Sequence, residues 1–307
     1  MWKYLFTALL ILASHAATAA PLDFNQAKLE ARRYVYFDRN TVGDEYCGCK
    51  WEWAGRNGGR FDLDQCGYQV RTQPTRAERV EWEHIVPASE LGRQRQCWQQ
   101  GGRSQCSRED GVFSRMEADL HNLAPVVGEV NGDRGNFQFG MLPNAPARHG
   151  ACDFRVDFQQ RLAQPAASVR GMVARVYFYM ADQYGLSLSR NQQQLFMAWD
   201  RQYPVDDWER ERDRRIAERM GHSNPFVIGS RSWRLGGAVD ATPPPAATTA
   251  AVDAAPTAVV HGNRQSRIYH LAHCPSYNAM AARNQVTFAD AASAEAAGYR
   301  RAGNCRP

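Results

Sequence analysis

The spacing of the cysteines is the feature that most restricts how this chain can fold. Six of the eight cysteines lie between Cys47 and Cys152, and the other two are Cys274 and Cys305. Disulfides persist in oxidising compartments, and an even number in each group indicates bridges within two separate parts of the chain. The sequence therefore predicts a large disulfide-tied part and a small part with one staple of its own.

Several pairings of the first six cysteines remain open on sequence grounds. Cys97 and Cys106 flank a Gly-Gly-Arg segment and are the pair that we favour. Cys47 and Cys49 are too close together to bridge each other comfortably, so we expect them to pair separately with Cys66 and Cys152. The alternative is a zinc cluster formed by Cys47, Cys49 and Cys66.

The first 19 residues are typical of a secretory signal peptide. Lys3 supplies a positive charge, residues 4–13 are apolar, and Ala17-Thr18-Ala19 fits the cleavage rule. The apolar run is too short to span a bilayer, and no other stretch could do so. We expect the mature protein to begin at Ala20 or Pro21, to be periplasmic or secreted, and to make no membrane contact.

Composition divides the rest of the chain into three parts. Residues 20–235 form one large domain, whose helical signals alternate with polar, cysteine-containing stretches. Residues 236–260 are rich in Ala, Thr and Pro, which predicts an extended linker. Residues 261–307 form a small module, which at this size needs a staple that Cys274 and Cys305 can supply.

Hydrophobic periodicity predicts several helices in the large domain. Asp23 is a predicted N-cap for the first of them, and the clearest amphipathic pattern runs over residues 169–184. Further helices are predicted after Ser189 and over residues 208–220. Residues 88–115 are polar and are predicted to form a long excursion closed by a disulfide.

The charged residues point to phosphate without proving it. Arginine accounts for 34 of the 37 basic residues, and the formal net charge is +5. Arginine recognises phosphate through a planar, bidentate fork. A GC-rich genome would also enrich arginine codons, so composition leaves both explanations open.

Residues 79–87 contain two adjacent side chains capable of chemistry, Glu83 and His84, within a run that alternates like a strand. A carboxylate buried in such a run needs a partner, and a cation is the candidate. In a regular strand Glu83 and His84 would face opposite sides, so serving one phosphate requires the strand to end or bulge there. We therefore predict irregular backbone at Glu83 and His84.

A second unusual stretch spans residues 119–136. Pro125 suits the first turn of a short helix that would end near Gly132, with the Asn131 amide pointing inward. A neutral histidine can take a proton from water, and Mg²⁺ prefers oxygen ligands such as carboxylate and amide. The two stretches are therefore predicted to be the halves of one metal-dependent site.

Three stretches resemble the bacterial periplasmic or secreted endonuclease I family, one of the ββα-metal (His-Me finger) nucleases. They are residues 81–88 (EWEHIVPA), 116–123 (MEADLHNL) and 128–134 (GEVNGDR), and the likeness runs from about residue 25 to 230. It implies an α+β fold with a ββα-metal core inside a disulfide-tied mixed domain. It also implies that His84 closes its strand and that a loop begins there. It also implies site roles: His84 as general base, Glu83 and Asn131 as Mg²⁺ ligands, Arg103 as phosphate stabiliser, and Glu117 as the residue that orients His84.

The resemblance further implies the reaction. We expect an exported, Mg²⁺-dependent, non-specific endonuclease that cuts double- or single-stranded DNA, and in some cases RNA, to 5′-phosphate ends. One Mg²⁺ would bind, with Mn²⁺ or Ca²⁺ able to substitute in binding, and the protein would act as a monomer. Its activity should fall as the pH drops below the pKa of His84. The rival interpretations are a nucleic-acid-binding or uptake protein without turnover, and a phosphatase.

The tail, residues 262–305, is similar to the small metal-binding module of the Ada DNA-repair proteins. The zinc form of that module uses four cysteines, and only Cys274 and Cys305 match here. A disulfide is therefore the favoured prediction, while His270 and His273 keep a zinc site open. We also predict that this module has a small α+β fold.

Overall fold

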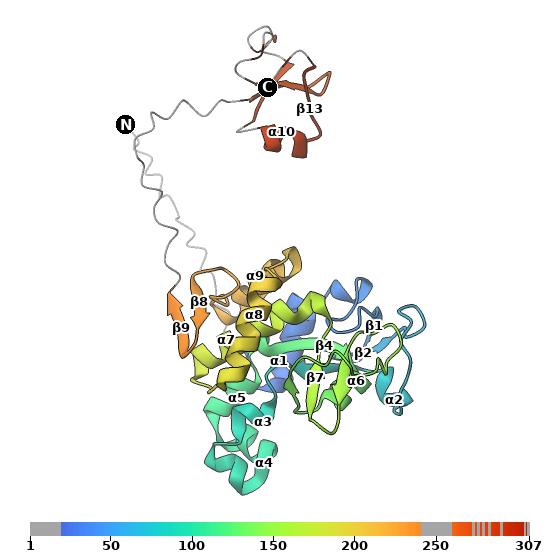
Figure 1. Cartoon of the computed structure of the whole chain (residues 1–307), viewed down its shortest axis with the longest axis vertical. Coiled ribbons are helices and arrows are strands. Elements are labelled where there is room, and N and C mark those ends of the chain that lie inside the picture. Colours follow the sequence, from blue (N-terminus) through green and yellow to red (C-terminus); the bar gives the residue numbers. More distant parts are fainter. Residues whose placement is uncertain are drawn as a thin grey trace, which may run out of the picture. The chain divides into compact units, whose positions relative to one another are not determined.

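The computed structural model describes residues 20–240 and, with gaps at 272–273, 275–276, 278–279, 282–283, 289–290 and 304, residues 260–305 (Figure 1). The predicted signal peptide lies outside the described residues. Two compact units are present, which divide after Ala241. None of the described helices combines the length and the apolar character that spanning a membrane requires.

The first unit is a mixture of helices and short, mostly antiparallel strands. Its α-helices are α1 (Phe24–Glu30, continued as a π-helix over Ala31–Val35), α2 (Pro74–Ala77), α3 (Ala88–Gly92), α4 (Gln96–Glu109), α5 (Gly111–Glu117), α6 (Gly128–Arg134), α7 (Arg170–Tyr184), α8 (Arg190–Gln202) and α9 (Asp207–Met220). Its 3-10 turns are Arg39–Thr41, Leu120–Asn122 and Ala167–Val169.

The strands of this unit form separate small sheets. They are β1 (Trp51–Ala54), β2 (Gly58–Phe61), β3 (Val80–His84), β4 (Leu123–Val127), β5 (Gln138–Phe139), β6 (Arg155–Asp157), β7 (Leu162–Gln164), β8 (Arg231–Arg234) and β9 (Gly237–Asp240). Three antiparallel pairs, β1–β2, β3–β4 and β8–β9, accompany a three-stranded sheet in the order β5-β7-β6. The α+β fold class is thereby confirmed.

Local signals account for the helices that the sequence predicted. The Asp23 carboxylate accepts a hydrogen bond from the Gln26 N–H at the start of α1, and Asp206 does the same for α9. Ser189 and Gln192 form a capping box at the start of α8. α7 is buried along nearly its whole length, which explains the long apolar pattern of residues 169–184.

The predicted start of a helix at Pro125 was wrong, and residues 123–127 have a different structure. They form the strand β4, which pairs with β3 so that Pro125 lies opposite Trp82, and the helix begins only at Gly128. A two-stranded sheet consists of edge strands, and an edge strand tolerates the missing N–H of a proline. The helix also extends beyond Gly132 to Arg134, and Gly135 ends it with a positive φ of 51°.

Residues 88–115 are likewise more regular than predicted. They hold α3, α4 and the start of α5, which form the lower part of the unit in Figure 1. Gly101 and Gly102 break α4 with non-helical dihedral angles, which lets Cys97 and Cys106 approach each other. Packing of the Trp98 ring against Phe113 and the close approach of Trp98 to Gly92 hold these helices together.

The disulfides in the first unit are those that the sequence favoured. Cys47 pairs with Cys152, Cys49 with Cys66, and Cys97 with Cys106. Because all of these sulfurs are bonded to each other, the alternative of a zinc cluster at Cys47, Cys49 and Cys66 is wrong. The bridge from Cys47 spans 105 residues and ties the loop before β1 to the segment before β6.

A buried charged network supports the core next to the site. His121 lies 3.2 Å from Asp119 through Nδ1 and 3.4 Å from Asp213 through Nε2. Tyr179 and Tyr184 each donate to the second oxygen of Asp119 at 2.7 Å. Burial alone would lower the pKa of His121, but the two carboxylates raise it, and the Arg212 guanidinium only partly opposes them. His121 is thus a structural residue that holds α9 against the turn before β4.

Replacing His121 with glutamine should change how stability depends on pH. A histidine with a raised pKa in the folded state stabilises the fold below its unfolded pKa of about 6.5, and this contribution is lost as pH rises through the folded pKa. Asp119 and Asp213 stay ionised because their pKa values are lowered by His121 despite burial. Urea unfolding at pH 6 should therefore lose about 1.5–3 kcal/mol in the variant, and the difference from wild type should shrink by pH 9. An equal loss at both pH values would contradict this assignment.

The second unit is a small α+β module. Its strands are β10 (Val260–Asn263), β11 (Ile268–His270), β12 (Gln285–Phe288) and β13 (Arg300–Arg301), in the sheet order β12-β10-β11-β13, with α10 (Ala291–Ala296). Cys274 and Cys305 are joined by the predicted disulfide. His273 lies outside the described residues, and no group of three or more His, Cys, Asp or Glu that could hold a metal occurs among those described.

The predicted linker boundary at residue 236 needs correction. Residues 237–240 form β9, which pairs with β8 in a hairpin turned through Gly236, whose φ is 104°. The Gly-Gly pair that looked like the start of a linker is therefore a turn within the first unit. The rest of the predicted linker, residues 241–259, lies outside the described residues.

Candidate active site

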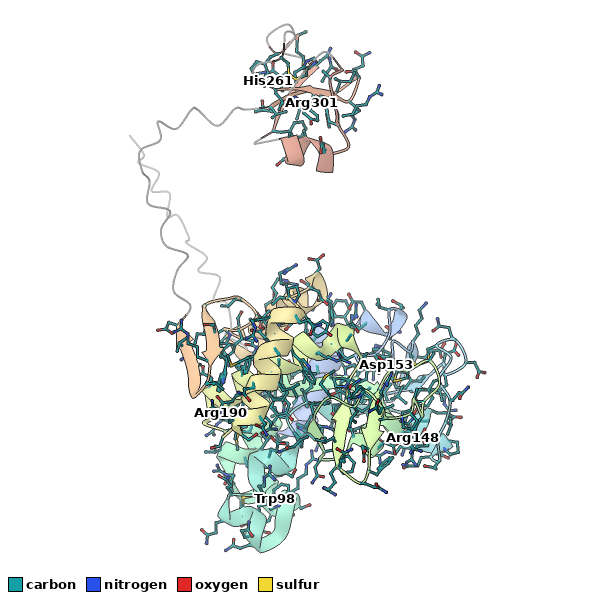
Figure 2. The ribbon with its side chains drawn as sticks, in the orientation of Figure 1. Trp98, Arg148, Asp153, Arg190, His261 and Arg301 are labelled. Carbon is teal, nitrogen blue, oxygen red and sulfur yellow. A yellow bond between two sulfur atoms is a disulfide. The ribbon has the colours of Figure 1, made fainter. Side chains whose placement is uncertain are left out.

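One pocket of about 260 Å³ brings together four of the residues singled out by the sequence. Glu83 and His84 come from the end of β3, Asn131 from α6 and Arg103 from α4. The same pocket is lined by Trp98, labelled in Figure 2 on the helical lower part of the unit, and by Asn136. A larger pocket, about 650 Å³, lies around residues 141–160 and contains none of these four residues.

His84 is held by the backbone of Glu117. The Nε2 atom lies 2.8 Å from the Glu117 carbonyl oxygen, and the Phe24 ring centroid lies 4.7 Å from that of the imidazole. A carbonyl only accepts hydrogen bonds, so Nε2 carries the proton and Nδ1 is the basic nitrogen of the neutral ring. Burial, helped by the Arg103 charge, lowers the pKa of His84 to about 3, which keeps the ring neutral.

The backbone at Glu83 and His84 is regular, which contradicts the predicted irregularity. Glu83 pairs with Ala124 and His84 with Leu123 in the β3–β4 ladder. The strand does close at His84, and the bend follows at Ile85 and Val86. The Asn122 side chain then replaces a strand partner by bonding the Val86 N–H at 2.7 Å and its carbonyl at 3.0 Å. Glu83 and His84 both reach the pocket because the strand ends there.

Glu83 is buried beside a cation and a phenol. Arg134 Nη1 lies 3.1 Å from Glu83 Oε1, and the Tyr46 hydroxyl donates to the same oxygen at 3.2 Å. Burial raises the pKa of Glu83 to about 7, although Arg134 and Tyr46 counteract that effect. Within residues 20–240, both contacts use Oε1, which leaves Oε2 available to a ligand in the pocket.

The helix α6 is fixed in place along its whole length. The Glu129 carboxylate accepts three backbone N–H bonds, of 2.6–2.9 Å, from residues 71–73. Asp133 binds the Arg71 guanidinium. Arg134 donates to the carbonyl oxygens of His84 at 2.8 Å and Ile85 at 2.6 Å. These contacts set the position of Asn131 relative to the end of β3.

Asn131 uses only one end of its amide in these contacts. Its Nδ2 atom donates to Glu81 Oε2 at 2.9 Å. No hydrogen bond to Oδ1 occurs within the described part of the domain, and Asn131 lines the pocket. An oxygen is thus free to act as a ligand.

Arg103 and Glu117 form one unit at the edge of the pocket. Arg103 Nε donates to Glu117 Oε1, and the Ser107 hydroxyl donates to Glu117 Oε2 at 2.7 Å. Glu117 is buried, whereas the Arg103 side chain remains 45% exposed. Glu117 therefore contacts His84 through its backbone and Arg103 through its carboxylate, so its side chain does not itself touch His84.

Sequence reasoning missed three residues that build this site. Arg134 is fully buried against Glu83, Asn122 completes the end of β3, and Glu81 holds Asn131. All three lie inside the stretches quoted for the family resemblance, which was the signal that could have singled them out. The role of Glu81 depends on a contact 50 residues away.

The donor atoms fit a hard divalent cation. Glu83 and Asn131 line one pocket. The Oε2 and Oδ1 atoms that their described hydrogen bonds leave unused are oxygens, the ligand type that Mg²⁺, Mn²⁺ and Ca²⁺ share. Two protein ligands suffice for Mg²⁺, which keeps several of its waters. The cysteines of the described domain cannot serve as zinc ligands here, because they are joined in disulfides.

Two antiparallel strands followed by a helix, with a histidine closing the first strand and an amide on the helix, define a ββα-metal nuclease. The family model described as Endonuclease I matches residues 23–230. The chain therefore belongs to the endonuclease I family and is an endonuclease. Members of this family are generally metal-dependent.

Individual relatives agree with this assignment. An extracellular deoxyribonuclease of Aeromonas hydrophila is 48% identical over 226 residues, which cover 73% of this chain and 95% of the relative. A periplasmic deoxyribonuclease of the same species is 51% identical over 183 residues, or 59% of this chain and 76% of the relative. Endonuclease-1 of Buchnera aphidicola subsp. Acyrthosiphon pisum is 42% identical over 205 residues, or 67% and 80%.

The tail matches a different family model, described as ArfC, over residues 241–301. This match does not test the resemblance to the Ada module, which stays a prediction.

Proposed function

We propose that this chain is an exported, Mg²⁺-dependent endonuclease that hydrolyses DNA without sequence preference and leaves 5′-phosphate ends. The observation that carries the proposal is the single pocket shared by His84, Glu83, Asn131 and Arg103. The relatives named as deoxyribonucleases support DNA as substrate. RNA is a second candidate substrate of the same chemistry, since the contacts proposed for Arg103 and the metal are to phosphate, which RNA shares with DNA.

His84 accepts a proton from the attacking water at Nδ1. Its Nε2–H bond to the Glu117 carbonyl fixes the tautomer and aims the ring. The lowered pKa of the buried ring keeps it unprotonated at neutral pH. As a positioned general base it contributes about 100- to 10,000-fold to the rate.

Glu83 and Asn131 would hold the metal, and Arg103 would bind the phosphate. A Mg²⁺ ion held there would supply positive charge to the phosphoryl and leaving oxygens. The Arg103 Nε is used by Glu117, so its two terminal nitrogens can form a fork on a phosphate oxygen pair. Glu117 therefore orients Arg103 with its carboxylate and His84 with its carbonyl.

The proposed location is the periplasm or the medium. Three disulfides tie the nuclease domain, which suits an oxidising compartment. The relatives are named extracellular and periplasmic. We also propose that the enzyme acts as a monomer.

Plasmid nicking by the oxidised mature protein tests this function. We expect supercoiled plasmid to be converted to open-circular and linear forms with Mg²⁺, and to remain intact with EDTA. Ligation of the products without added kinase would confirm the 5′-phosphate ends. DNA binding without cutting under Mg²⁺, Mn²⁺ or Ca²⁺ would favour the nucleic-acid-binding interpretation instead. Turnover of small phosphate esters with plasmid left intact would favour a phosphatase.

A further inference from the structure

Asn131 can ligate a cation with only one end of its amide. The oxygen and nitrogen ends are nearly equal in size, so an unrestrained asparagine can present either one. Here Nδ2 lies 2.9 Å from Glu81 Oε2. An ionised carboxylate only accepts hydrogen bonds, so the nitrogen end must face Glu81. The oxygen end is then turned away from Glu81 and is the end left for the pocket.

Glu81 is itself held rigidly. Arg76 Nε lies 2.8 Å from Glu81 Oε1, and Arg76 Nη2 lies 2.7 Å from Oε2, which is a bidentate pair. Arg79 adds a longer contact of 3.8 Å to Oε1. The Glu81 side chain is 23% exposed, so the pair is only partly screened by water. Glu81 is therefore a fixed acceptor and not a mobile surface carboxylate.

Two glycines of α6 allow Arg76, the partner of Glu81, to lie close to the helix. A Cβ added at Gly132 would lie 2.2 Å from Arg76 Nη1, and one at Gly128 would lie 2.4 Å from the Arg76 carbonyl oxygen. Glycine destabilises a helix relative to alanine. Two glycines in a seven-residue helix mark a close approach that the site requires. Asn131 lies between these glycines in sequence.

We infer that Glu81 is a positioning residue for the cation ligand Asn131 and that Arg76 fixes Glu81 in turn. The inference rests on the proposed function. Glu81 and Glu83 lie two residues apart on β3, so they share one face of the strand. Glu83 lines the pocket and Glu81 does not. Both residues on this face of β3 therefore serve the same cation. Glu83 acts as a ligand, and Glu81 acts by orienting the ligand Asn131.

The test is metal affinity in the substitution Glu81→Gln. A glutamine can offer either amide end to Asn131, which removes the preference for the oxygen-out orientation, and it loses the ion pair with Arg76. Titration of the full-length protein with Mn²⁺, followed by the EPR signal of the free ion and without DNA, should give a dissociation constant raised about 10- to 100-fold. Nicking at saturating metal should recover to within a few-fold of wild type.

Glu78→Gln is the matched control. Glu78 pairs with Arg60 at 2.7 Å, and both side chains are largely exposed. It lies three residues from Glu81 and does not contact Asn131, so Mn²⁺ affinity should not change. Arg76→Gln is a second variant that leaves Glu81 in place but removes its anchor, and it should raise the dissociation constant as well.

The outcomes separate the inference from the function on which it rests. Wild-type Mn²⁺ affinity in folded Glu81→Gln and Arg76→Gln, together with weakened binding in Glu83→Gln, would overturn the inference alone. If the wild-type protein binds no Mn²⁺ and Glu83→Gln has the same Mn²⁺ binding and nicking rate as wild type, the inference and the proposed function are both overturned. Should Glu81→Gln fail to fold by near-ultraviolet circular dichroism, the Arg76→Gln result decides.

Discussion

Replacing His84 with alanine is expected to lower plasmid cleavage by about 100- to 10,000-fold, because the site loses its general base. The imidazole is buried, and within residues 20–240 its polar contact is the Glu117 carbonyl. Its removal leaves Glu83, Asn131 and Arg103 in place, so DNA and divalent-cation binding should persist. The measurement is the initial rate of nicking at saturating Mg²⁺, alongside filter binding of DNA with Ca²⁺.

His222→Ala is the control for this experiment. His222 is an exposed histidine after α9 that contacts Tyr179 at 2.9 Å and does not line the pocket. Its substitution should leave the nicking rate close to wild type. A His84→Ala protein that is folded and cuts at the wild-type rate would remove His84 from the mechanism. Loss of DNA binding together with cutting would instead indicate that His84 is needed to assemble the site.

Removing the Cys47–Cys152 disulfide by replacing both residues with serine is expected to be the largest stability effect. The bridge spans 105 residues, and closing a loop of that length contributes about 5 kcal/mol in the chain-entropy account. The bridge also adjoins Tyr46, whose ring packs at 4.7 Å against Phe154 and whose hydroxyl supports Glu83. The midpoint of urea unfolding should fall accordingly, and Mg²⁺ affinity should fall with it.

The double substitution of Cys97 and Cys106 provides the comparison. That bridge spans nine residues, which predicts a smaller loss of about 3 kcal/mol. Its loss should loosen α4 and with it Arg103, so phosphate binding should suffer more than metal binding. Equal destabilisation by both pairs of substitutions would argue that loop length does not govern the effect.

The elements that could be predicted are those specified by nearby residues. Asp23 and Asp206 cap their helices through bonds three residues away, and the periodic apolar residues of α7 predict a helix that packs in the core. The helices are thus specified by residues close together in the sequence. The disulfides join residues as far as 105 positions apart, and they were predicted from cysteine spacing and export.

The elements that could not be predicted depend on partners distant in sequence. Pro125 looked like a helix start because nothing near it reveals that β3 will lie alongside as a partner. Residues 88–115 look like a loop because α4 has no strong apolar face and is held by a bridge and by Trp98 packing on Phe113.

The candidate site divides in the same way. The resemblance assigned five residues to one site: His84, Glu83, Asn131, Arg103 and Glu117. The pocket contains the first four. The role suggested for Glu117 differs in detail, because the contact with His84 uses a backbone carbonyl that no side-chain pattern encodes. Glu81 and Arg134 escaped notice because their partners lie about 50 residues away.

The attachment of Tyr46 beside the Cys47–Cys152 bridge has a consequence for the cell that makes this enzyme. In a reducing interior the bridge would not form, and the phenol that supports Glu83 would lose its tether. A newly made chain that has not yet been exported would therefore be a poor nuclease toward its own chromosome. Full nuclease activity would require oxidation of the cysteines, which takes place outside the compartment that holds the host genome. Nicking assays with and without a thiol reductant would measure that safeguard.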